Sequence, residues 1–242
     1  MAIVLFTDFG SADIYIGQVK AVLQQWAPQI AVIDLANDLP PFNVRAAAHL
    51  LDALKAPFPE GSVFICVVDP GVGTARAAIV VEADGRRYVG PDNGLMSVVA
   101  ARAAAVRFFS IAWRPERLSD SFHGRDLFAP VAARLVAGTL PPEHLRPLSA
   151  LAENCGAQDL GEVIYIDHYG NACTGIRASN VPRDAVLSAN GQRISYARVF
   201  GEAGAKPFWY ENSHGLVEIA MNRANAAQTL GLGIGRPVRL GS

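Results

Sequence analysis

Four polar clusters interrupt the apolar stretches of this sequence, and their side chains are of types that can do chemistry. In chain order the clusters are Asp8 with Asp13 and Tyr15, Asp69 with Arg76, Phe122 to Asp126 around His123, and Asp167 to Asn171. Carboxylates bind hydroxyl groups and accept protons, an imidazole titrates near neutral pH, and a guanidinium stabilises developing negative charge. These side-chain types predict a site that positions a small polar substrate or moves a proton.

The second cluster begins where an apolar run ends. The run from Val63 to Val68 is typical of a buried strand, and the next residues are Asp69-Pro70-Gly71-Val72-Gly73-Thr74-Ala75-Arg76. Proline fixes φ and glycine permits backbone conformations closed to other residues. The segment therefore predicts a tight loop that brings Asp69 and Arg76 together, although taken alone it is also typical of a plain turn.

Each cluster has a purely structural interpretation as well. Asp8 can cap a helix, Arg76 can lie on the surface, and His123 can be a loop histidine with satisfied hydrogen bonds. The segment from Asp167 to Asn171 can be only a turn, and we predict Asp126 as the N-cap of the helix that follows it. These interpretations weaken jointly, because the first three clusters fall in predicted loops of one sheet.

Composition limits the classes of protein that fit. The chain has 242 residues, 51% of them hydrophobic, and a formal net charge of -1, so it can bury a sizeable core in one or two domains and has no basic excess to recruit nucleic acid. Its three cysteines are scattered, which indicates a reducing compartment. The apolar start lacks the features of a signal peptide, and no stretch is long enough to span a membrane. We expect a cytoplasmic protein with a small-molecule substrate.

The first half of the chain alternates strand and helix patterns. Strands are predicted at 3–6, 31–35, 63–68, 78–82, 87–90 and 106–111, and helices at 15–26, 42–54, 94–104 and 126–137, with Asn43 as a possible cap. The two strands around Asp84-Gly85 are expected to form a hairpin. This alternation predicts an α/β domain over 1–150 with a mainly parallel sheet, whose ligands bind beyond the carboxyl ends of the strands. Asp8 and Asp69 both lie there.

The pattern changes near residues 140–160, where prolines indicate a connector. Beyond it come short β-like runs at 162–167, 185–189, 192–196, 216–220 and 237–240, separated by glycine and asparagine turns. They predict a small all-β domain over 160–242, barrel-like or a sandwich.

Several segments together resemble a known family, the S-adenosylmethionine hydroxide adenosyltransferases, also called S-adenosylmethionine hydrolases. The matching segments are Thr7-Asp8-Phe9-Gly10, Val68 to Thr74 with Arg76, Gly90-Pro91-Asp92-Asn93-Gly94-Leu95, Phe122-His123-Gly124-Arg125-Asp126, Asp167 to Asn171, and Asn222-Arg223-Ala224-Asn225-Ala226. They occur in the right order over nearly the whole chain. The family is related to the fluorinating and chlorinating enzymes that attack the same substrate with halide.

The resemblance implies an activity and a catalytic set. The family converts S-adenosylmethionine and water to adenosine and L-methionine by in-line displacement at the ribose 5′-carbon. Its Asp, Arg and His correspond to Asp69, Arg76 and His123, and the halide-using relatives lack this set. By the same resemblance we expect S-adenosylmethionine as substrate, no cofactor, no metal, and a homotrimer with sites at the subunit interfaces.

Substrate contacts carry over position by position. Asp8 matches the carboxylate that binds the ribose 2′- and 3′-hydroxyls, and Asp13 and Tyr15 lie near the methionine or ribose side. Phe42 stands where the halogenases carry a tryptophan beside the ribose, and Phe122 matches an aromatic wall. In the second domain Asp167 is expected at the methionine ammonium, Asn171 at the adenine edge, Phe200 stacked on adenine, Ser213 at the methionine carboxylate, and Arg223 among the binding residues. The chain departs from the halogenases in a loop one residue shorter at 167–171 and in His214 and Met221, which replace arginines.

Three alternatives remain open. A halogenase would use the same substrate, and a non-catalytic protein could bind adenosine or S-adenosylmethionine with the same contacts. A metal-dependent hydrolase could use Asp8, Asp69 and His123 as ligands, although no clustered metal-binding spacing supports it.

Overall fold

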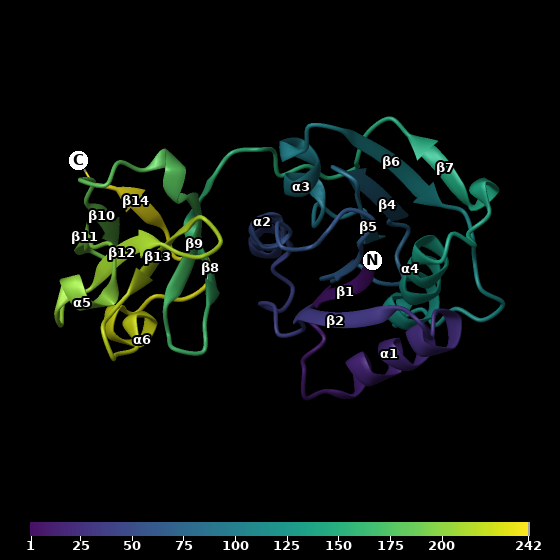
Figure 1. Ribbon diagram of the computed structural model, residues 1–242, viewed down its shortest axis with the longest axis horizontal. Helices are drawn as coiled ribbons and strands as arrows, with labels where there is room; N and C mark the ends of the chain where they lie inside the picture. The colour runs from purple at the N-terminus through teal and green to yellow at the C-terminus, as the bar shows by residue number, and fades with distance from the viewer. Residues whose placement is uncertain (242) are drawn as a thin grey trace. The chain divides into compact units, whose positions relative to one another are not determined.

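The computed structural model describes residues 1–241 and divides into two compact units (Figure 1). Unit 1 comprises Met1–Leu51 and Lys55–Ala157, and unit 2 comprises Asp52–Leu54 with the chain from Gln158 onward. Each unit contains one sheet, and the boundary falls within the stretch predicted to connect two domains.

The sheet of unit 1 is mixed. Within the described chain its strands are β1 (Ala2–Thr7), β2 (Ala31–Ala36), β3 (Val63–Val67), β4 (Ala78–Ala83), β5 (Arg86–Pro91), β6 (Val106–Ile111) and β7 (Leu145–Leu148), in the order β2-β1-β3-β5-β4-β6-β7. The neighbours from β2 to β5 are parallel, and those from β5 to β7 are antiparallel.

The prediction of a mainly parallel sheet is therefore wrong for half of it, and the reason is local. Asp84 and Gly85 both have positive φ, 46° and 76°, which is the turn geometry of a tight hairpin. A two-residue connection can join only antiparallel strands, so β4 reverses against β5 and the later strands follow it. β7 lies inside the predicted connector, as an edge strand where Pro147 is tolerated.

The helices of unit 1 begin close to the predicted positions but not always at them. They are α1 (Ile14–Trp26), α2 (Val44–Leu54), α3 (Ser97–Arg102), a π-helical turn η1 (Gly124–Phe128), α4 (Ala129–Val136) and a 3₁₀ turn η2 (Pro142–His144). The prediction of Asn43 as a cap is confirmed, because its side chain accepts from the amide of Ala46. Asp126 is not an N-cap. It lies inside η1 and pairs with Arg125.

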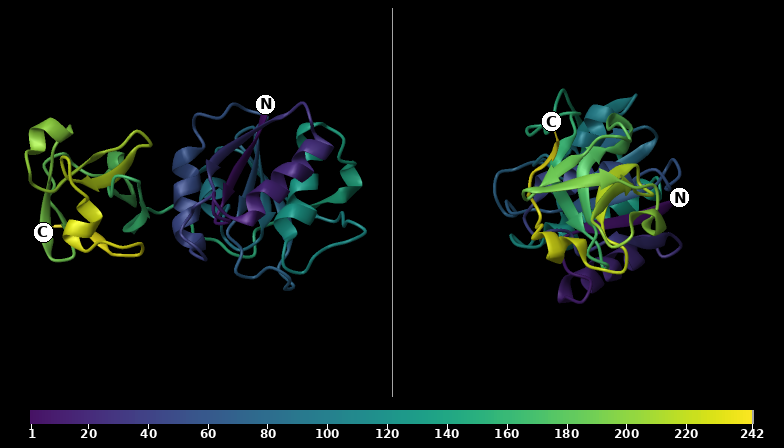
Figure 2. Two further views of the ribbon diagram at one scale, coloured as in Figure 1. Left: turned by 90° about the horizontal axis from the view of Figure 1, so that it is seen from below. Right: turned by 90° about the vertical axis from the view of Figure 1, so that its left-hand side faces the viewer.

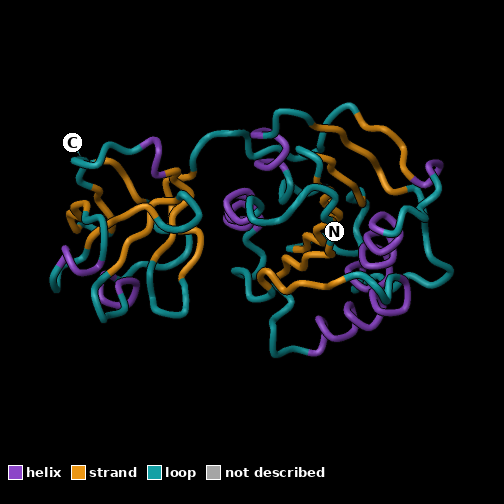
Figure 3. The backbone as a smooth tube through the Cα atoms, in the orientation of Figure 1, coloured by secondary structure: helices purple, strands orange, loops and turns teal. Residues whose placement is uncertain are grey.

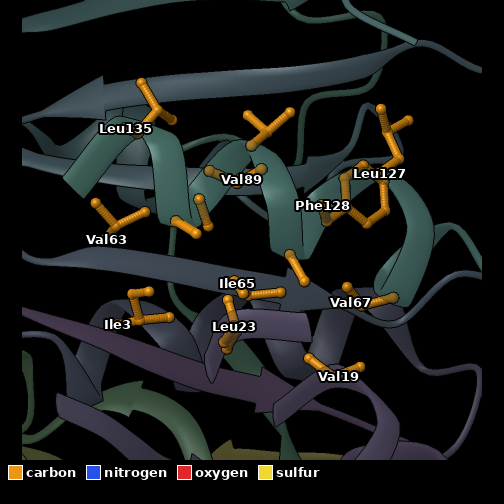
Figure 4. Close-up of a cluster of buried hydrophobic side chains, with 14 of the residues drawn as sticks. Ile3, Val19, Leu23, Val63, Ile65, Val67, Val89, Leu127, Phe128 and Leu135 are labelled. Atoms are coloured by element: carbon orange, nitrogen blue, oxygen red, sulfur yellow. The ribbon is translucent and has the colours of Figure 1, made fainter. Parts of the chain in front are cut away.

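The core of unit 1 lies between the sheet and the helices α1 and α4 (Figure 4). Three fully buried side chains belong to this core: Val19 and Leu23 of α1, and Phe128, the last residue of η1. They belong to the same cluster as Ile65 and Val67 of β3. Burial of each such side chain stabilises the fold by roughly 1.5–3 kcal/mol. This packing fixes the carboxyl end of β3 relative to η1. Asp69 follows β3 closely, and His123 directly precedes η1.

Unit 2 is a nearly closed antiparallel sheet with one parallel pair, drawn in green and yellow in Figure 2 and traced in Figure 3. Among the residues described, its strands are β8 (Leu160–Ile166), β9 (Ala172–Arg177), β10 (Leu187–Ala189), β11 (Gln192–Tyr196), β12 (Phe208–Glu211), β13 (Leu216–Ala220) and β14 (Val238–Leu240), with η3 (Ala178–Asn180), α5 (Phe200–Ala203) and α6 (Ala226–Leu230) between them. The order is β14-β10-β11-β12-β13-β9-β8.

A bridge between Glu162 and Pro237 links the two edges of this sheet, which agrees with the expected barrel-like form. Trp209 is fully buried at its centre and donates to the carbonyl of Ala185 over 2.9 Å. The strands β9 and β12 were not predicted. Gly175 interrupts the first pattern, and the second has only four residues.

Candidate active site

A cavity of about 350 Å³ opens at the carboxyl ends of β1 and β3 in unit 1. Its lining contains seven of the residues that the sequence singled out, namely Asp8, Asp13, Tyr15, Phe42, Asp69, Phe122 and His123. The lining also includes Phe9, Pro41, Val67, Val72, Ser121 and Gly124. Loops after two neighbouring parallel strands thus converge with the segment before η1, as the strand-end argument predicts.

Asp69, Arg76 and His123 form one hydrogen-bonded set at this cavity. The Nε of Arg76 donates to Oδ1 of Asp69 over 3.0 Å, and its Nη2 donates to Oδ2 of the same carboxylate. The same Nη2 lies 3.0 Å from Nδ1 of His123. The side chains of Arg76 and Asp69 are only 10% and 4% exposed. Arg76 does not line the cavity itself. It forms hydrogen bonds with Asp69 and His123, which do, and so positions both side chains.

This arrangement sets the tautomer of His123. A guanidinium can only donate hydrogen bonds, so Nδ1 of His123 must be the acceptor and the proton of the neutral ring is on Nε2. Burial, followed by the charge of Arg76, lowers the pKa of His123 below its usual value, while Asp69 opposes the shift. His123 is thus held neutral, with an N–H donor available at Nε2.

The loop that carries Asp69 and Arg76 is held on two sides. Gly73 has a φ of 77°, and a Cβ there would collide with the backbone carbonyl of Asp120. The side chain of Asn93 donates to the carbonyl of Val68 over 2.9 Å. The loop is therefore pinned between the segment before η1 and the turn after β5.

Phe128 packs against two members of the set, Arg76 and His123. The guanidinium carbon of Arg76 lies 5.5 Å from the centre of the Phe128 ring, and the ring of His123 meets the same phenyl edge-on at 6.5 Å. Phe128 is completely buried, so the cation–π contact forms away from water, where it is strongest.

Asp8 and Phe42 form a second part of the lining. The backbone amide of Phe42 donates to Oδ2 of Asp8 over 3.2 Å, and Phe42 has a φ of 63° although it is not glycine. Such a conformation is costly for an aromatic residue, and strained backbone of this kind clusters at active sites and ligand-binding sites. Burial raises the pKa of Asp8, against the lowering effect of the Phe42 amide.

Aromatic rings make the rest of the wall. The rings of Phe9, Tyr15 and Phe122 meet one another at centroid distances of 5.4–6.2 Å. Asp13 lies beside them, but its Oδ1 accepts from the amide of Ile14 over 2.6 Å and caps α1. Asp13 therefore has a structural role in addition to its place at the cavity.

A second cavity, of about 480 Å³, lies in unit 2 and contains three further predicted residues, Asn171, Phe200 and Arg223. Tyr169, Met221, Ala224 and Asn225 complete its lining. Gly170 packs so closely on Asn225 that a Cβ would overlap its amide, and Ala227 donates to the carbonyl of Gly170 over 2.8 Å. These contacts join the β8–β9 turn to the start of α6.

Two predicted contact residues lie outside the lining of that cavity. Asp167 accepts from the backbone amides of Tyr169 and Asn171 and from the Asn171 side chain, each within 2.9 Å, so both of its oxygens serve its own turn. Ser213 lies in the β12–β13 turn, with its hydroxyl 3.4 Å from Nε2 of His214.

The sequence argument did not single out Phe9, Val72 or Ser121 in the first cavity, nor Tyr169 or Asn225 in the second. All five lie within or beside the quoted motifs, which is the signal that could have found them. In residues 1–241 no three His, Cys, Asp or Glu side chains are grouped so that they could hold a metal ion. No helix of the described chain has the length and apolar character needed to cross a bilayer.

Comparisons with known proteins bear on the whole chain. The family profile for the SAM hydroxide adenosyltransferase N-terminal domain matches residues 3–146, and that for the C-terminal domain matches residues 161–239. A protein of Thermus thermophilus named (R)-S-adenosyl-L-methionine hydrolase is 43% identical, with 97% of each chain covered. One of the same name from Salinispora arenicola is 37% identical, with 97% of this chain and 95% of the relative covered.

Structural similarity agrees with the sequence matches. The crystal structure of an uncharacterized conserved protein from Thermotoga maritima superimposes with a TM-score of 0.89 at 33% identity, covering 99% of this chain and all of the other. A fluorinase from Actinopolyspora mzabensis is more distant, at 26% identity over 98% of this chain and 96% of the relative. The chain belongs to the S-adenosylmethionine hydroxide adenosyltransferase family, as its motifs predicted.

Proposed function

We propose that this protein hydrolyses S-adenosylmethionine to adenosine and L-methionine by attack of water at the ribose 5′-carbon. The names of its relatives specify the (R) configuration at sulfur, and we extend that preference to this chain. The observation that carries the proposal is the single set formed by Asp69, Arg76 and His123 at the cavity that also contains Asp8.

The reaction needs alignment more than acid catalysis. Water attacks C5′ opposite the sulfur, a C–O bond forms, the C–S bond breaks, and its electron pair returns to sulfur as the neutral thioether of methionine. One proton must leave the attacking oxygen. Holding water and carbon in line can lower the barrier by roughly 7–11 kcal/mol.

The hydrogen bonds divide the work among the three residues. Asp69 keeps lone pairs beyond those that Arg76 uses, so its carboxylate accepts the proton of the attacking water. His123 donates from Nε2 to the water oxygen and fixes its direction. Arg76 orients both. In this proposal Asp69 and His123 face the water and Arg76 does not line the cavity, and the hydrogen bonds favour Asp69 over His123 as the proton acceptor.

Charge at the cavity favours water over halide. The lining has three carboxylates, Asp8, Asp13 and Asp69, and in the part of the chain described no lysine or arginine lines it. Such a site attracts the cationic sulfonium and repels chloride or fluoride. Asp8 is suited to the ribose diol, and Asn171, Phe200 and Arg223 to the adenine end. A cytoplasmic homotrimer remains our prediction from the family resemblance.

Isotope labelling tests the reaction directly. The protein is incubated with each sulfur epimer of S-adenosylmethionine in ¹⁸O-labelled water, with and without chloride, and the products are separated by liquid chromatography and weighed by mass spectrometry. We expect label in the adenosine 5′-hydroxyl, faster reaction of the (R) epimer and no chlorinated nucleoside. Label-free adenosine or a halogenated product would rule the proposal out.

Substitution of Arg76 tests the catalytic set. Arg76→Lys retains the charge but cannot donate to Asp69 through two nitrogens while also reaching His123. We expect kcat to fall about 10²- to 10³-fold, the loss typical of a preorganised donor, while calorimetry shows little change in adenosine affinity. Arg107→Lys, at an exposed arginine paired with Glu82, is the matched control and should retain full activity. Equal kcat in the two variants would contradict the assigned role.

A further inference from the structure

Unit 2 contains a buried carboxylate that the proposed reaction does not use. Glu218 lies in the middle of β13 and is only 7% exposed. The Tyr210 hydroxyl donates to its Oε1, and the Asn212 side-chain amide donates to its Oε2 over 2.8 Å. Burial of a charge costs several kcal/mol unless hydrogen bonds compensate it, so this carboxylate is held by specific partners.

One partner of Glu218, the side chain of Asn212, organises a turn. Oδ1 of Asn212 accepts from the backbone amides of His214 and Leu216, each over 3.0 Å. Because Oδ1 is used in this way, Nδ2 points to the other side, where it donates to Glu218 and, over 3.5 Å, to the Sγ of Cys173. The orientation of the Asn212 amide therefore fixes the turn that presents Ser213.

The other partner, Tyr210, packs against the ring of Phe200, which is called the Phe200 platform below. The Tyr210 ring lies 5.4 Å from that of Phe200, which in turn lines the cavity of unit 2. Burial and the bond to Glu218 raise the pKa of the Tyr210 hydroxyl, so it stays a donor. Burial likewise raises the pKa of Cys173 to about 12, which leaves its thiol neutral.

The requirement for a carboxylate follows from the geometry. Two donors, the Tyr210 hydroxyl and the Asn212 amide, each bond to a different oxygen of this side chain. A glutamine has one acceptor and one donor, so it could accept from Asn212 only if the Tyr210 hydroxyl turned round to accept from the new NH2 group. Only a carboxylate accepts from both partners at once.

We propose that Glu218 is a positioning residue that sets two substrate-binding elements at once, the Phe200 platform through Tyr210 and the Ser213 turn through Asn212. The inference rests on the proposed function for the identity of the ligands. It assigns Glu218 to binding rather than to the chemical step, which takes place in unit 1.

Three variants test it. Glu218→Gln should raise KM for S-adenosylmethionine about tenfold, the loss expected for a misaligned hydrogen-bonded group, with kcat at saturation nearly unchanged. Tyr210→Phe removes one arm only and should weaken adenosine binding several-fold while inhibition by methionine is unchanged. Glu211→Gln, an exposed glutamate of the same hairpin paired with Arg183, is the matched control and should behave as wild type.

Adenosine affinity is measured by calorimetry, which needs no turnover, so failure of the proposed reaction and failure of this inference can be told apart. A wild-type KM in Glu218→Gln would overturn the inference. If that variant is misfolded by circular dichroism, Tyr210→Phe decides, and unchanged adenosine affinity there would overturn it equally.

Discussion

At the scale of single residues, the most informative contact joins Arg76 to His123. Burial disfavours a charged ring, and two cations 3.0 Å apart would repel each other, so burial and the always-charged guanidinium together lower the pKa of His123 and favour the neutral imidazole. The neutral ring accepts from Arg76 at Nδ1, so the group that it can offer to a ligand is the N–H donor at Nε2. In the reaction that we propose, the proton acceptor is therefore Asp69, whose carboxylate Arg76 holds with two nitrogens.

The pH dependence of hydrolysis should reflect that neutral ring. Because the pKa of His123 is lowered, we expect the acid limb of kcat to lie below the usual range of an imidazole, at pH values where the ring gains a proton and loses its bond to Arg76. In His123→Asn the side-chain oxygen can still accept from Arg76, so the limb assigned to His123 should disappear. A limb unchanged in that variant would assign it to another group, such as Asp8, whose pKa is raised.

At the scale of elements, the conformation of the loop from Asp69 to Arg76 depends more on Gly73 than on Gly71. Gly73→Ala places a methyl group against the carbonyl of Asp120 at a positive φ, so we expect the free energy of unfolding to fall by about 2–4 kcal/mol and kcat to fall with it. At Gly71 a Cβ would meet only ordinary contacts, the nearest being the Thr74 hydroxyl at 3.5 Å. Gly71→Ala is therefore the control, measured by the same thermal unfolding and rate assays. Equal stability of the two variants would show that the Asp120 contact does not hold the loop.

The sequence predicts these elements well where local chemistry decides them. Apolar runs identified β1 and β3, and the Asp84-Gly85 pair identified the hairpin, yet that same hairpin makes the sheet mixed, which depends on pairing between distant strands. The π-helical turn at Gly124–Phe128 could not be predicted, because an N-cap pattern and a bulged first turn share the same residue types.

The candidate site was predictable for a related reason. Side chains at strand ends converge whatever the detailed packing, so Asp8 and Asp69 could be expected together from their positions after two strands. His123 precedes a helical turn, and its polar cluster and motif singled it out. The direction of a hydrogen bond is not written in the sequence. The tautomer of His123 depends on its contact with Arg76, and the Asp167 side chain bonds to the backbone of its own turn. Neither could be predicted from the sequence.

At the scale of the whole molecule, the predicted contacts divide between two cavities, one in each unit. The family resemblance predicts a trimer whose sites draw on more than one chain, and closed cyclic assemblies permit such sharing. Mixing two variants, each impaired in a different unit, tests this. Arg76→Ala removes the catalytic set of unit 1, and Asn171→Ala removes a contact of unit 2.

If a site takes unit 1 from one chain and unit 2 from another, co-expressed variants assemble some sites in which both halves are intact. Random assembly at equal amounts restores about a quarter of the wild-type rate, because half of the chains supply each intact unit. The specific activity of the mixture is measured beside each variant alone, and light scattering gives the mass of the assembly relative to the 25.7 kDa chain. A site built within one chain never regains both intact halves on mixing. Activity of the mixture no greater than the average of the two separate variants would therefore refute a shared site.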